Sequence, residues 1–542
     1  MKIAIAQINT IVGALRANSD KSIQYISDAY DKGADIVLLP EATITGYMAL
    51  DLLFNEKFIK DNIKELHRIK ENIPNDIIVV IGFIDAENDK LYNSAAVLQG
   101  GEISGFVRKI KLPVYDVFNE SRYYTAATYT KPVKVTIKDQ QVYLGVQICE
   151  DMWDETDNNV TSQLVSEGAD LILNISASPF TVGKKSTRER LVLKHSKENS
   201  IPFFYCNLVG GQDEVVFDGS SLAADTKGNL IHISPSFKEE LSVIEIDLEK
   251  VDPRSHVMTS EQNQLEDSFN AIRLGIRDYI LKSGFDSAIL GLSGGVDSSL
   301  VAVIAVEALG PEKVTGISMP SRFSSEHSKS DAELLANNLN MNFKRIPIES
   351  PHKDFLDILE KDFQGKNRNE TEENLQARIR GTVLMAFSNK FGHFPLSTGN
   401  KTEMALGYAT MYGDMAGGLA PISDVSKLKV YQLCRYYNEL KEEEIIPLSV
   451  LTKRPSAELS EAQYDPFDYE VVSPLVDELI ENGSTKAQLV EKGYDEDTID
   501  KISLLIIKSE YKRRQAPPGI KITRKAFGIG RRMPLINHYS GR

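Results

Sequence analysis

Cysteine and tryptophan are scarce: the 542 residues include three cysteines and one tryptophan. Cys149, Cys206 and Cys434 are too far apart for a metal-binding or redox motif, which excludes a disulfide scaffold and indicates a reducing compartment. Long apolar runs are also absent, since the longest, 300–306, is too short to cross a bilayer. Residues 1–9 lack the continuous apolar core of a signal peptide and predict a β-strand. We therefore expect a soluble, cytoplasmic protein without a membrane partner.

Positive charge is in deficit, with 62 Lys and Arg against 77 Asp and Glu, a net charge of −15. Nucleic-acid and anionic-membrane partners both need a basic surface, so the average argues against them. The segment 508–532 departs from this average, because nine Lys and Arg accompany the single acid Glu510. A solvated tail and a local anion site are both open for it. Because one core rarely grows beyond about 250–300 residues, the length predicts at least two domains.

Strand-like apolar runs alternate with helical segments, which predicts an α/β architecture with largely buried sheets. In the first half the strand-like runs are 36–39, 77–81, 142–146, 171–175 and 203–205, and the helical segments are 21–32 and 58–71. The second half repeats the alternation with helical segments at 264–282 and 300–309 and strands at 288–292, 314–318 and 394–399. A polar stretch between the halves places a linker at 251–263, so the predicted domains are 1–250 and 264–542.

A glycine-rich loop, GLSGGVDSS at 291–299, follows an apolar strand and opens a helical run. Its glycines let the backbone turn tightly and expose N–H groups, and the helix start adds partial positive charge, so the loop suits a phosphate. The serine hydroxyls add donors, and Asp297 is a candidate Mg²⁺ ligand. The spacing differs from the Walker and dinucleotide patterns. The alternative is an ordinary turn between a strand and a helix.

This loop resembles the pyrophosphate-binding loop of the ATP pyrophosphatases, which cleave ATP to AMP and pyrophosphate to activate a carboxylate or carbonyl. Two further strings, NLQARIR at 374–380 and STGNKTE at 397–403, resemble internal motifs of the NAD synthetases within that family. The resemblance implies a Rossmann-like domain of the adenine nucleotide alpha hydrolase-like type, with ATP as co-substrate. The implied ATP-binding residues are Gly291, Leu292, Ser293, Gly294, Gly295, Val296, Asp297, Ser298, Thr398 and Lys427.

The same resemblance implies a second substrate and a metal ion. Deamido-NAD would contact Asn374, Arg378, Glu403 and Lys512, and Mg²⁺ would bind Asp297 and Glu403. Considered singly, these positions have simpler roles. Thr398 suits a helix cap, Glu403 an acid in a first helical turn, and Arg378 an exposed surface position.

Three residues of the first half suggest nucleophilic catalysis. Glu41 follows an apolar strand, Lys109 lies in VRKIKLP, and Cys149 ends the strand at 142–148, where an exposed nucleophile would sit. Taken alone, Cys149 is more often a buried hydrophobe, Glu41 an acid at a helix start and Lys109 a solvated cation. Together the three strings resemble the Glu-Lys-Cys triad of the nitrilase superfamily. The resemblance implies that 1–250 is an α-β-β-α sandwich acting as a glutamine amidohydrolase, or glutaminase.

The chemistry of amide hydrolysis explains these residue types. Only a thiolate attacks, so Cys149 needs a base, and Glu41 would take its proton and later activate water. The Lys109 ammonium would stabilise the oxyanion together with N–H donors, an effect worth roughly 10²–10³ in rate. By resemblance, Tyr115, Ser178 and Lys184 contact glutamine, and Glu120 orients Lys109. Ser178, which precedes a proline, also suits a plain turn.

Nearly the whole chain resembles the two-domain, glutamine-using branch of the NAD synthetases. Met411, where ammonia-using members carry a lysine, and Tyr511-Lys512, where they carry His-Lys, agree with that branch, and we assign Met411 no role. The resemblance implies glutamine hydrolysis, adenylylation of deamido-NAD with release of pyrophosphate, and amidation to NAD⁺ with release of AMP, the last step of NAD biosynthesis. It also implies a homo-oligomer, at least a dimer through the synthetase domain. The alternatives are a glutamine-dependent amide ligase for nicotinate mononucleotide or another carboxylate, and a catalytically silent nucleotide-binding protein.

Overall fold

The computed structural model describes residues 1–542 except 157, 248–262, 461–462, 538 and 540–542. By its internal contacts the chain divides into two compact units, Met1–Gln262 (unit 1) and Asn263–Arg542 (unit 2). Apart from Asn263, the predicted linker 251–263 lies outside the described residues, so its limits stay a prediction.

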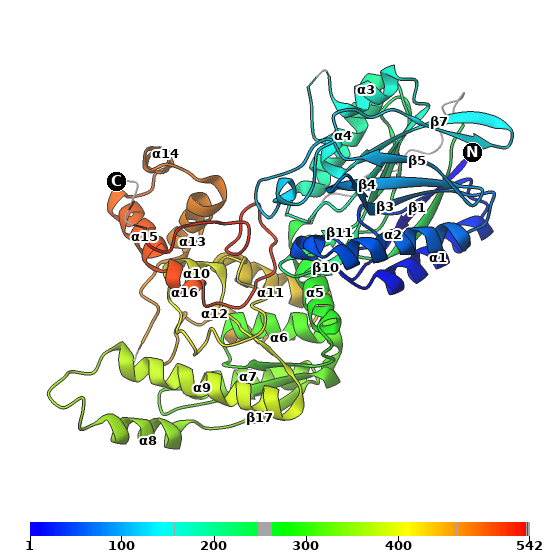
Figure 1. The fold of residues 1–542 in the computed structure, drawn as a ribbon. Coiled ribbons are helices and arrows are strands. Elements are labelled where there is room, and N and C mark those ends of the chain that lie inside the picture. The colour runs from blue at the N-terminus through cyan, green and yellow to red at the C-terminus, as the bar shows by residue number, and fades with distance from the viewer. Residues whose placement is uncertain (157, 248–262, 461–462, 538, 540–542) are drawn as a thin grey trace. The chain divides into compact units, whose positions relative to one another are not determined.

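Unit 1 contains two six-stranded sheets (Figure 1). Sheet 1 consists, in spatial order, of β14 (Glu240–Glu245), β1 (Lys2–Gln7), β2 (Ile36–Leu38), β3 (Ile78–Glu87), β4 (Lys90–Gln99) and β5 (Glu102–Arg108). Sheet 2 consists of β13 (Leu230–Ile233), β12 (Leu222–Ala224), β9 (Phe203–Asn207), β8 (Leu171–Ser176), β7 (Gln140–Ile148) and β6 (Val133–Ile137). A separate antiparallel pair joins β10 (Val209–Gln212) to β11 (Val215–Asp218).

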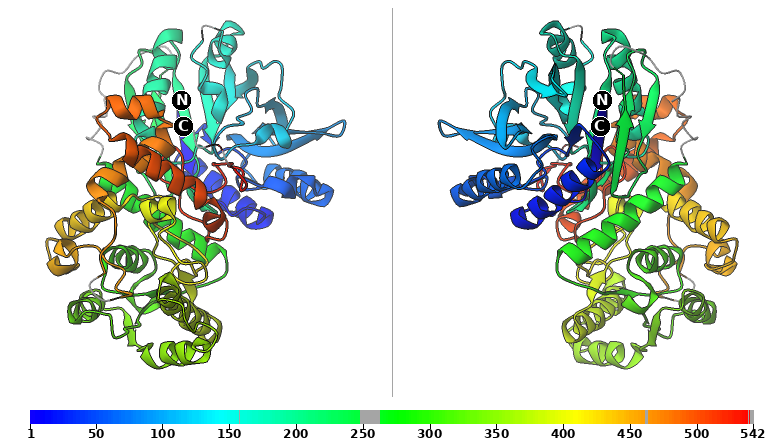
Figure 2. Two further views of the ribbon diagram at one scale, coloured as in Figure 1. Left: turned by 90° about the vertical axis from the view of Figure 1, so that its left-hand side faces the viewer. Right: turned by 90° about the vertical axis from the view of Figure 1, so that its right-hand side faces the viewer.

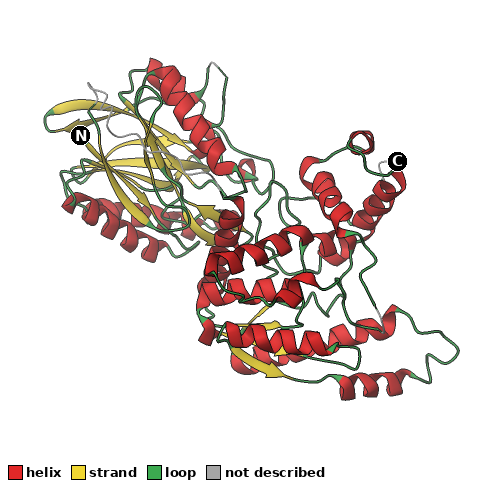
Figure 3. Cartoon of the chain, turned by 180° about the vertical axis from the view of Figure 1, so that it is seen from behind, coloured by secondary structure: helices red, strands yellow, loops and turns green. Residues whose placement is uncertain are grey.

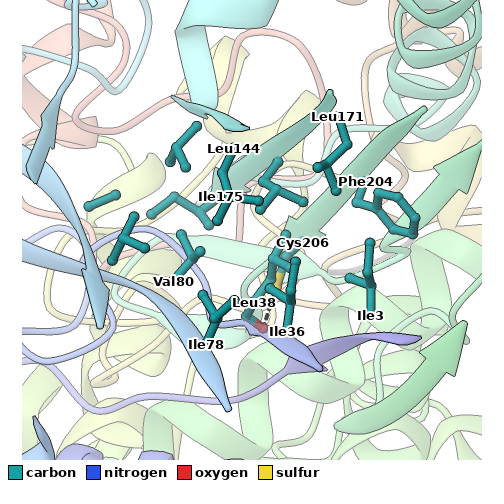
Figure 4. Close-up of a cluster of buried hydrophobic side chains, with 14 of the residues drawn as sticks. Ile3, Ile36, Leu38, Ile78, Val80, Leu144, Leu171, Ile175, Phe204 and Cys206 are labelled. Atoms are coloured by element: carbon teal, nitrogen blue, oxygen red, sulfur yellow. Dashed lines mark hydrogen bonds between the residues drawn. The ribbon is translucent and has the colours of Figure 1, made fainter. Parts of the chain in front are cut away.

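The two sheets face each other and are covered by helices on their outer sides. The inner faces share one buried cluster that includes Leu38 of sheet 1 and Phe204 of sheet 2 (Figure 4). The outer side of sheet 1 packs against α1 (Leu15–Asp31) and α2 (Glu56–Glu71). The outer side of sheet 2 packs against α3 (Val160–Ser166) and α4 (Lys184–Asn199), and the two pairs of helices lie on opposite sides of unit 1 (Figure 2). The expected α-β-β-α sandwich is therefore confirmed.

The central strands are continuous apolar runs because both of their faces are covered. Strand β8, LILNIS, pairs in parallel with β7 and β9, and all six of its residues are buried. Parallel strands with a layer on each face need this pattern rather than strict alternation. Helix α2 instead buries one stripe that includes Ile59, Leu66 and Ile69, as expected for a helix with one face on a sheet.

Unit 2 is built on a four-stranded parallel sheet with helices on both faces (Figure 3). The spatial order is β17 (Asn342–Arg345), β16 (Val314–Ser318), β15 (Ala288–Gly291) and β18 (Phe394–Leu396). The first strand of unit 2, β15, therefore lies between β16 and β18. Chain connections leave it in opposite directions, and such a switch point opens a crevice at the carboxyl ends of the strands. The expected Rossmann-like α/β fold is confirmed.

Helices make up most of the rest of unit 2. They are α5 (Gln264–Lys282), α6 (Val296–Leu309), α7 (Glu326–Asn338), α8 (Glu349–Leu359), α9 (Glu370–Phe391), α10 (Lys401–Leu406), α11 (Lys427–Lys441), α12 (Leu448–Thr452), α13 (Tyr469–Asp477), α14 (Lys486–Glu491), α15 (Glu496–Lys508) and α16 (Glu510–Arg513). Residues of α10, α13 and α15 share a buried cluster, which forms a helical layer beside the sheet-containing part. Among the described residues, no helix combines the length and apolarity that a membrane span requires.

The predicted helices and strands are present, but several helices begin a few residues before the apolar pattern that predicted them. The helix predicted at 58–71 begins at Glu56, because the Asn55 side chain accepts the N–H groups of the first turn. The helix predicted at 300–309 begins at Val296, which places Asp297 in its first turn. Strands β4, β5, β6, β10 to β13 and β17 were not predicted.

Candidate active sites

The nucleophile predicted in unit 1 lies in a strained turn. Cys149 follows β7 and begins a short 3₁₀ helix, Cys149–Met152, with a positive φ of 46°. Such backbone is uncommon outside glycine and marks a position that the surrounding fold must hold. The expectation of an exposed side chain is wrong: Cys149 is only 5% exposed, because it packs into the cluster between the sheets. Burial and the neighbouring Glu41 raise the pKa of the thiol well above its usual range, while Lys109 opposes this.

The two predicted partners of Cys149 are fully buried beside each other. The Lys109 ammonium lies 2.7 Å from Glu41 Oε1 and 2.9 Å from Glu120 Oε2. Glu41 also accepts hydrogen bonds from the Asn93 side chain at 2.7 Å and the Ala177 N–H at 2.8 Å. Lys109 is thus not a solvated cation, and Glu41 lies in a turn rather than at a helix start. Burial opposes the charge of Lys109, but the two carboxylates outweigh it and raise its pKa well above the usual range.

Glu120 also contacts the Lys109 ammonium, which it was expected to orient. Its Oε1 accepts the Tyr47 hydroxyl hydrogen at 2.9 Å and the Lys109 ammonium at 3.0 Å. Burial raises the pKa of Glu120 to about 7, while Lys109 lowers it and Glu41 adds to the rise. Two carboxylates therefore hold one ammonium, which limits the positions that the ammonium can take.

The residues predicted to contact glutamine surround the nucleophile turn. Tyr115 is half exposed, and its hydroxyl donates to Glu150 Oε2 at 2.9 Å. The Lys184 ammonium lies 5.2 Å from the centre of the Trp153 ring and lowers the pKa of Glu150, whose burial raises it. Ser178 is buried, and its hydroxyl has no hydrogen-bond partner among the described residues. A buried hydroxyl in this state is available to a ligand.

The glycine-rich loop of unit 2 connects β15 to α6. Gly294 has a φ of +78°, and a Cβ there would lie 2.2 Å from the Ser328 carbonyl oxygen, so only glycine fits. The Gly295 N–H donates to Ser293 Oγ at 3.1 Å, and Ser293 Oγ lies 3.1 Å from Ser298 Oγ. The backbone and hydroxyl groups of the loop therefore converge at the start of a 14-residue helix, which is the arrangement predicted for a phosphate site.

The predicted metal ligands meet at one lysine. The Lys427 ammonium lies 2.6 Å from Asp297 Oδ2 and 3.0 Å from Glu403 Oε1. Burial raises the pKa of Glu403 to about 7, Lys427 lowers it, and Asp297 adds to the rise. Asn400 donates to Asp297 Oδ1 at 2.8 Å and also caps α10. Glu403 completes that capping box, so it has the simpler role of a first-turn acid. It also contacts the Lys427 ammonium.

Two cavities lie at the carboxyl ends of the unit 2 strands, with volumes of about 440 Å³ and 240 Å³. The larger is lined by ten predicted residues: Ser293, Gly295, Val296, Asp297, Ser298, Asn374, Thr398, Glu403, Lys427 and Lys512. The smaller is lined by Gly291, Leu292, Ser293 and Thr398. Thr398 therefore lies between the two cavities, and it is not a helix cap, since Asn400 caps α10. The volumes are of the size that small-molecule ligands occupy.

Two of the residues predicted for unit 2, Gly294 and Arg378, do not line either cavity. Gly294 allows the tight turn of the loop. Arg378 is half exposed and donates through Nε to the Met411 carbonyl at 3.4 Å. Met411, to which no role was assigned, thus contacts Arg378 through its backbone. The Lys512 ammonium lines the larger cavity and donates to the carbonyls of Gly407 and Ala409 at 2.8 and 2.9 Å.

The basic segment 508–532 is not a solvated tail throughout. Arg513 and Arg531 both pair with Glu510, at 2.8 and 2.7 Å. Arg513 also donates to the carbonyl of Ala405 at 2.9 Å. Part of the cationic excess thus fastens the carboxyl-terminal segment to α10.

Comparisons with known proteins identify the family. A family model described as carbon-nitrogen hydrolase matches residues 2–254, and one described as NAD synthase matches residues 268–516. A Synechocystis sp. protein named glutamine-dependent NAD(+) synthetase is 43% identical over 556 residues, which cover 99% of both chains. A Thermotoga maritima protein of the same name is 41% identical over 575 residues, again 99% of both chains. The chain belongs to the glutamine-dependent NAD(+) synthetase family.

A solved structure from this family agrees over the full length. The glutamine-dependent NAD⁺ synthetase of Acinetobacter baumannii, in complex with ADP, has a TM-score of 0.79 and 35% sequence identity. The match covers 99% of this chain and 98% of that one. Members of the glutamine-dependent NAD(+) synthetase family are ligases that form a carbon–nitrogen bond with glutamine as the nitrogen donor.

Sequence reasoning missed three charged residues near these sites. Glu150 directly follows the nucleophile, and that position was its only signal. Arg380 ends the NLQARIR string, lines the smaller cavity and donates to the Met319 carbonyl at 3.1 Å, and burial lowers its pKa to about 10. Lys453 lines the larger cavity and donates to the Gly294 carbonyl. No motif in the sequence marks Lys453.

The Lys427 ammonium stabilises two largely buried carboxylates, so we expect Lys427→Met to lower the free energy of unfolding of unit 2 by about 3 kcal/mol at pH 8. Without the ammonium the pKa of Glu403 rises further above its present value of about 7. Glu403 then takes up a proton as the pH falls from 8 to 6, which removes the uncompensated charge. The deficit should therefore be smaller at pH 6, as measured by urea unfolding at both pH values.

Lys441→Met is the matched control, because Lys441 also lies on α11 but pairs with Glu307 at a more exposed position. Its loss should cost no more than about 1 kcal/mol at either pH. An equal deficit for Lys427→Met at pH 6 and pH 8 would show that Glu403 does not titrate in response to Lys427.

Proposed function

We propose that this protein hydrolyses glutamine in unit 1 and uses the ammonia in unit 2 to convert deamido-NAD to NAD⁺ at the expense of ATP. The observation that carries the proposal is the presence of both sites in one chain: a buried Glu-Lys-Cys group, and a glycine-rich loop beside a paired carboxylate site. The family membership favours deamido-NAD over nicotinate mononucleotide or another carboxylate as the acid.

In unit 1, Cys149 acts as the nucleophile. Glu41 accepts the thiol proton, and the thiolate attacks the side-chain amide carbon of glutamine. The Lys109 ammonium, held by Glu120, stabilises the oxyanion of the tetrahedral intermediate. Collapse breaks the carbon–nitrogen bond, and Glu41 returns the proton so that ammonia leaves. Water activated by Glu41 then hydrolyses the thioester to release glutamate.

The residues around the turn bind glutamine. The buried Ser178 hydroxyl has no hydrogen-bond partner in the described part of the chain, and Tyr115, Glu150 and Lys184 present a hydroxyl and charges of both signs. Glutamine carries an ammonium and a carboxylate on its α-carbon, so charges of both signs are suited to it.

In unit 2, the loop 291–298 binds the phosphates of ATP, and Thr398 and Lys427 contact the nucleotide. The nicotinate carboxylate of deamido-NAD attacks the α-phosphorus, and pyrophosphate leaves. Ammonia then attacks the acyl carbon, and AMP leaves with the oxygen that joined it to the substrate. Asn374, Arg378, Glu403 and Lys512 hold deamido-NAD; for Arg378 this role rests on the resemblance alone.

The residues present fit Mg²⁺. Asp297 and Glu403 supply carboxylate oxygens, and both face one ammonium in the described structure, so the pair already accommodates a cation. One or two carboxylates together with substrate phosphates are a frequent Mg²⁺ ligand set. When bound, Mg²⁺ would neutralise phosphate charge and favour departure of pyrophosphate.

The decisive assay combines the full chain with glutamine, ATP, Mg²⁺ and deamido-NAD and measures NAD⁺. Replacing deamido-NAD with nicotinate mononucleotide tests the nearer alternative, because only the true acid supports release of pyrophosphate. A chain that releases no pyrophosphate with either acid would be a silent nucleotide-binding protein.

We expect Cys149→Ala to abolish NAD⁺ formation from glutamine and to spare formation from ammonium, since unit 2 keeps its own site. Nitrogen-15 from labelled glutamine should enter NAD⁺ in the unchanged protein. Cys206→Ala is the matched control, because Cys206 is equally buried but its thiol faces the carbonyls of Ala6 and Leu38. Loss of both activities in Cys149→Ala would contradict two separable sites.

We expect Asp297→Asn to reduce NAD⁺ formation from either nitrogen source by about 10²-fold and to raise the Mg²⁺ concentration needed for half-maximal rate. Glutamine hydrolysis measured alone should persist. Glu307→Gln provides the control, because Glu307 lies on the same helix but pairs with Lys441 and Tyr437. An unchanged Mg²⁺ dependence in Asp297→Asn would rule out the metal role.

The protein acts in the cytoplasm as a homodimer formed through unit 2. The three cysteines are free thiols, which suits a reducing compartment. Exposed apolar side chains on α8 support the dimer: Phe355 and Ile358 are 47% and 72% exposed. Apolar surface of this kind often marks a protein interface.

We expect sedimentation to report twice the chain mass at micromolar concentration, and Ile358→Glu to shift the equilibrium towards the monomer. Leu448→Glu changes a similarly exposed leucine on α12 and should leave the mass unchanged. A monomer at every concentration of the unchanged protein would refute the dimer.

A further inference from the structure

The Asp151 side chain connects two loops of the glutamine site. Its Oδ1 accepts hydrogen bonds from the N–H groups of Ile110 at 3.0 Å and Lys111 at 2.8 Å. Its Oδ2 accepts the N–H of Ile148 at 3.0 Å. Asp151 is 1% exposed, so these contacts form in the interior of unit 1.

The three donors lie at the ends of strands from two different sheets. Ile110 and Lys111 directly follow Lys109, at the end of β5 in sheet 1. Ile148 directly precedes Cys149, as the last residue of β7 in sheet 2. The Asp151 carboxylate thus joins the segment that carries the Lys109 ammonium to the segment that carries the Cys149 thiol.

This connection is costly, and the turn that it holds is strained. Burial raises the pKa of Asp151 to about 6, although the three N–H groups oppose the rise. Cys149 adopts a φ of 46° only because its surroundings hold it there. On the other side of the turn, His195 Nε2 lies 2.8 Å from the Met152 carbonyl oxygen.

We propose that Asp151 is a positioning residue that sets the distance between the Lys109 ammonium and the Cys149 thiol by bonding the ends of both sheets. The inference rests on the proposed glutaminase function and deepens it. The hydrogen-bond partners of the Asp151 carboxylate are backbone N–H groups of Ile110, Lys111 and Ile148, so we expect Asp151 to act on the rate of the chemical step rather than on binding of glutamine.

The test is Asp151→Asn in the full chain. Asparagine keeps one acceptor oxygen and turns an NH₂ group towards either the Ile148 N–H or the N–H pair at 110–111, so one of the two loops is released. A displacement of about 1 Å can cost about 10²-fold in rate. We expect kcat for glutamine hydrolysis to fall by about 10²-fold, with KM for glutamine changed less than about threefold and NAD⁺ formation from ammonium unchanged.

Alkylation of Cys149 by iodoacetamide gives a second readout. Displacing the Lys109 ammonium from the thiol removes an influence that lowers the thiol pKa, so Asp151→Asn should react more slowly. Asp154→Asn is the matched control, because Asp154 lies on the same segment but pairs with the Lys111 side chain and accepts the Thr156 N–H, rather than bonding the backbone next to Lys109 or Cys149. It should keep the kcat and the alkylation rate of the unchanged protein.

Normal kcat in Asp151→Asn would overturn the proposal, and so would equal losses with glutamine and ammonium, which indicate a general structural role. If Asp151→Asn does not fold, Asp151→Glu decides, because it keeps the charge but moves it by one methylene. We expect a kcat loss of about tenfold there, and an unchanged kcat would overturn the positioning role. If the unchanged protein hydrolyses no glutamine, the proposed function itself fails.

Discussion

A buried lysine paired with two carboxylates organises each site of this chain. In unit 1 the Lys109 ammonium lies between Glu41 and Glu120, and in unit 2 Lys427 lies between Asp297 and Glu403. An unpaired buried charge is costly, so each group is held only while its partners are present. Burial raises the pKa of one carboxyl in each set, Glu120 and Glu403, to about 7. Each site therefore holds an ammonium in a fixed position, and one of its two carboxyl groups has a raised pKa.

The strand topology brings these charges together. Glu41 follows β2, Cys149 follows β7 and the glycine-rich loop follows β15, each at the carboxyl end of a parallel strand, whereas Lys109 follows the antiparallel strand β5. Backbone N–H groups and the start of a helix are available there, and side chains from neighbouring strands converge. The two units reach this arrangement differently: unit 1 uses the facing ends of two sheets, and unit 2 uses the switch point of one sheet.

The sequence indicated the strands and loops that carry motifs better than it indicated the rest. Continuous apolar runs such as β8 were evident because both faces of a parallel strand are covered. Strand β4, KLYNSAAVLQ, was missed because Lys, Asn, Ser and Ala are poor strand formers, and its pairing with β3 overrides that preference. The burial of Cys149 was missed because its position at the end of a strand does not reveal which residues of the facing sheet pack against it. Lys453 and Glu150 gave no periodic or motif signal, since their roles arise only when distant segments meet.

The dependence of the glutamine site on two sheets has a consequence for its core. Lys109 and Glu41 follow strands of sheet 1, whereas Cys149 and the Ala177 N–H that binds Glu41 follow strands of sheet 2. The distance between these groups is therefore set by the side chains packed between the sheets, including Leu38 and Phe204 (Figure 4). Such cores are close-packed and transmit strain. Changes in side-chain volume within this layer consequently act on glutamine hydrolysis as well as on stability, without touching any residue that contacts the substrate.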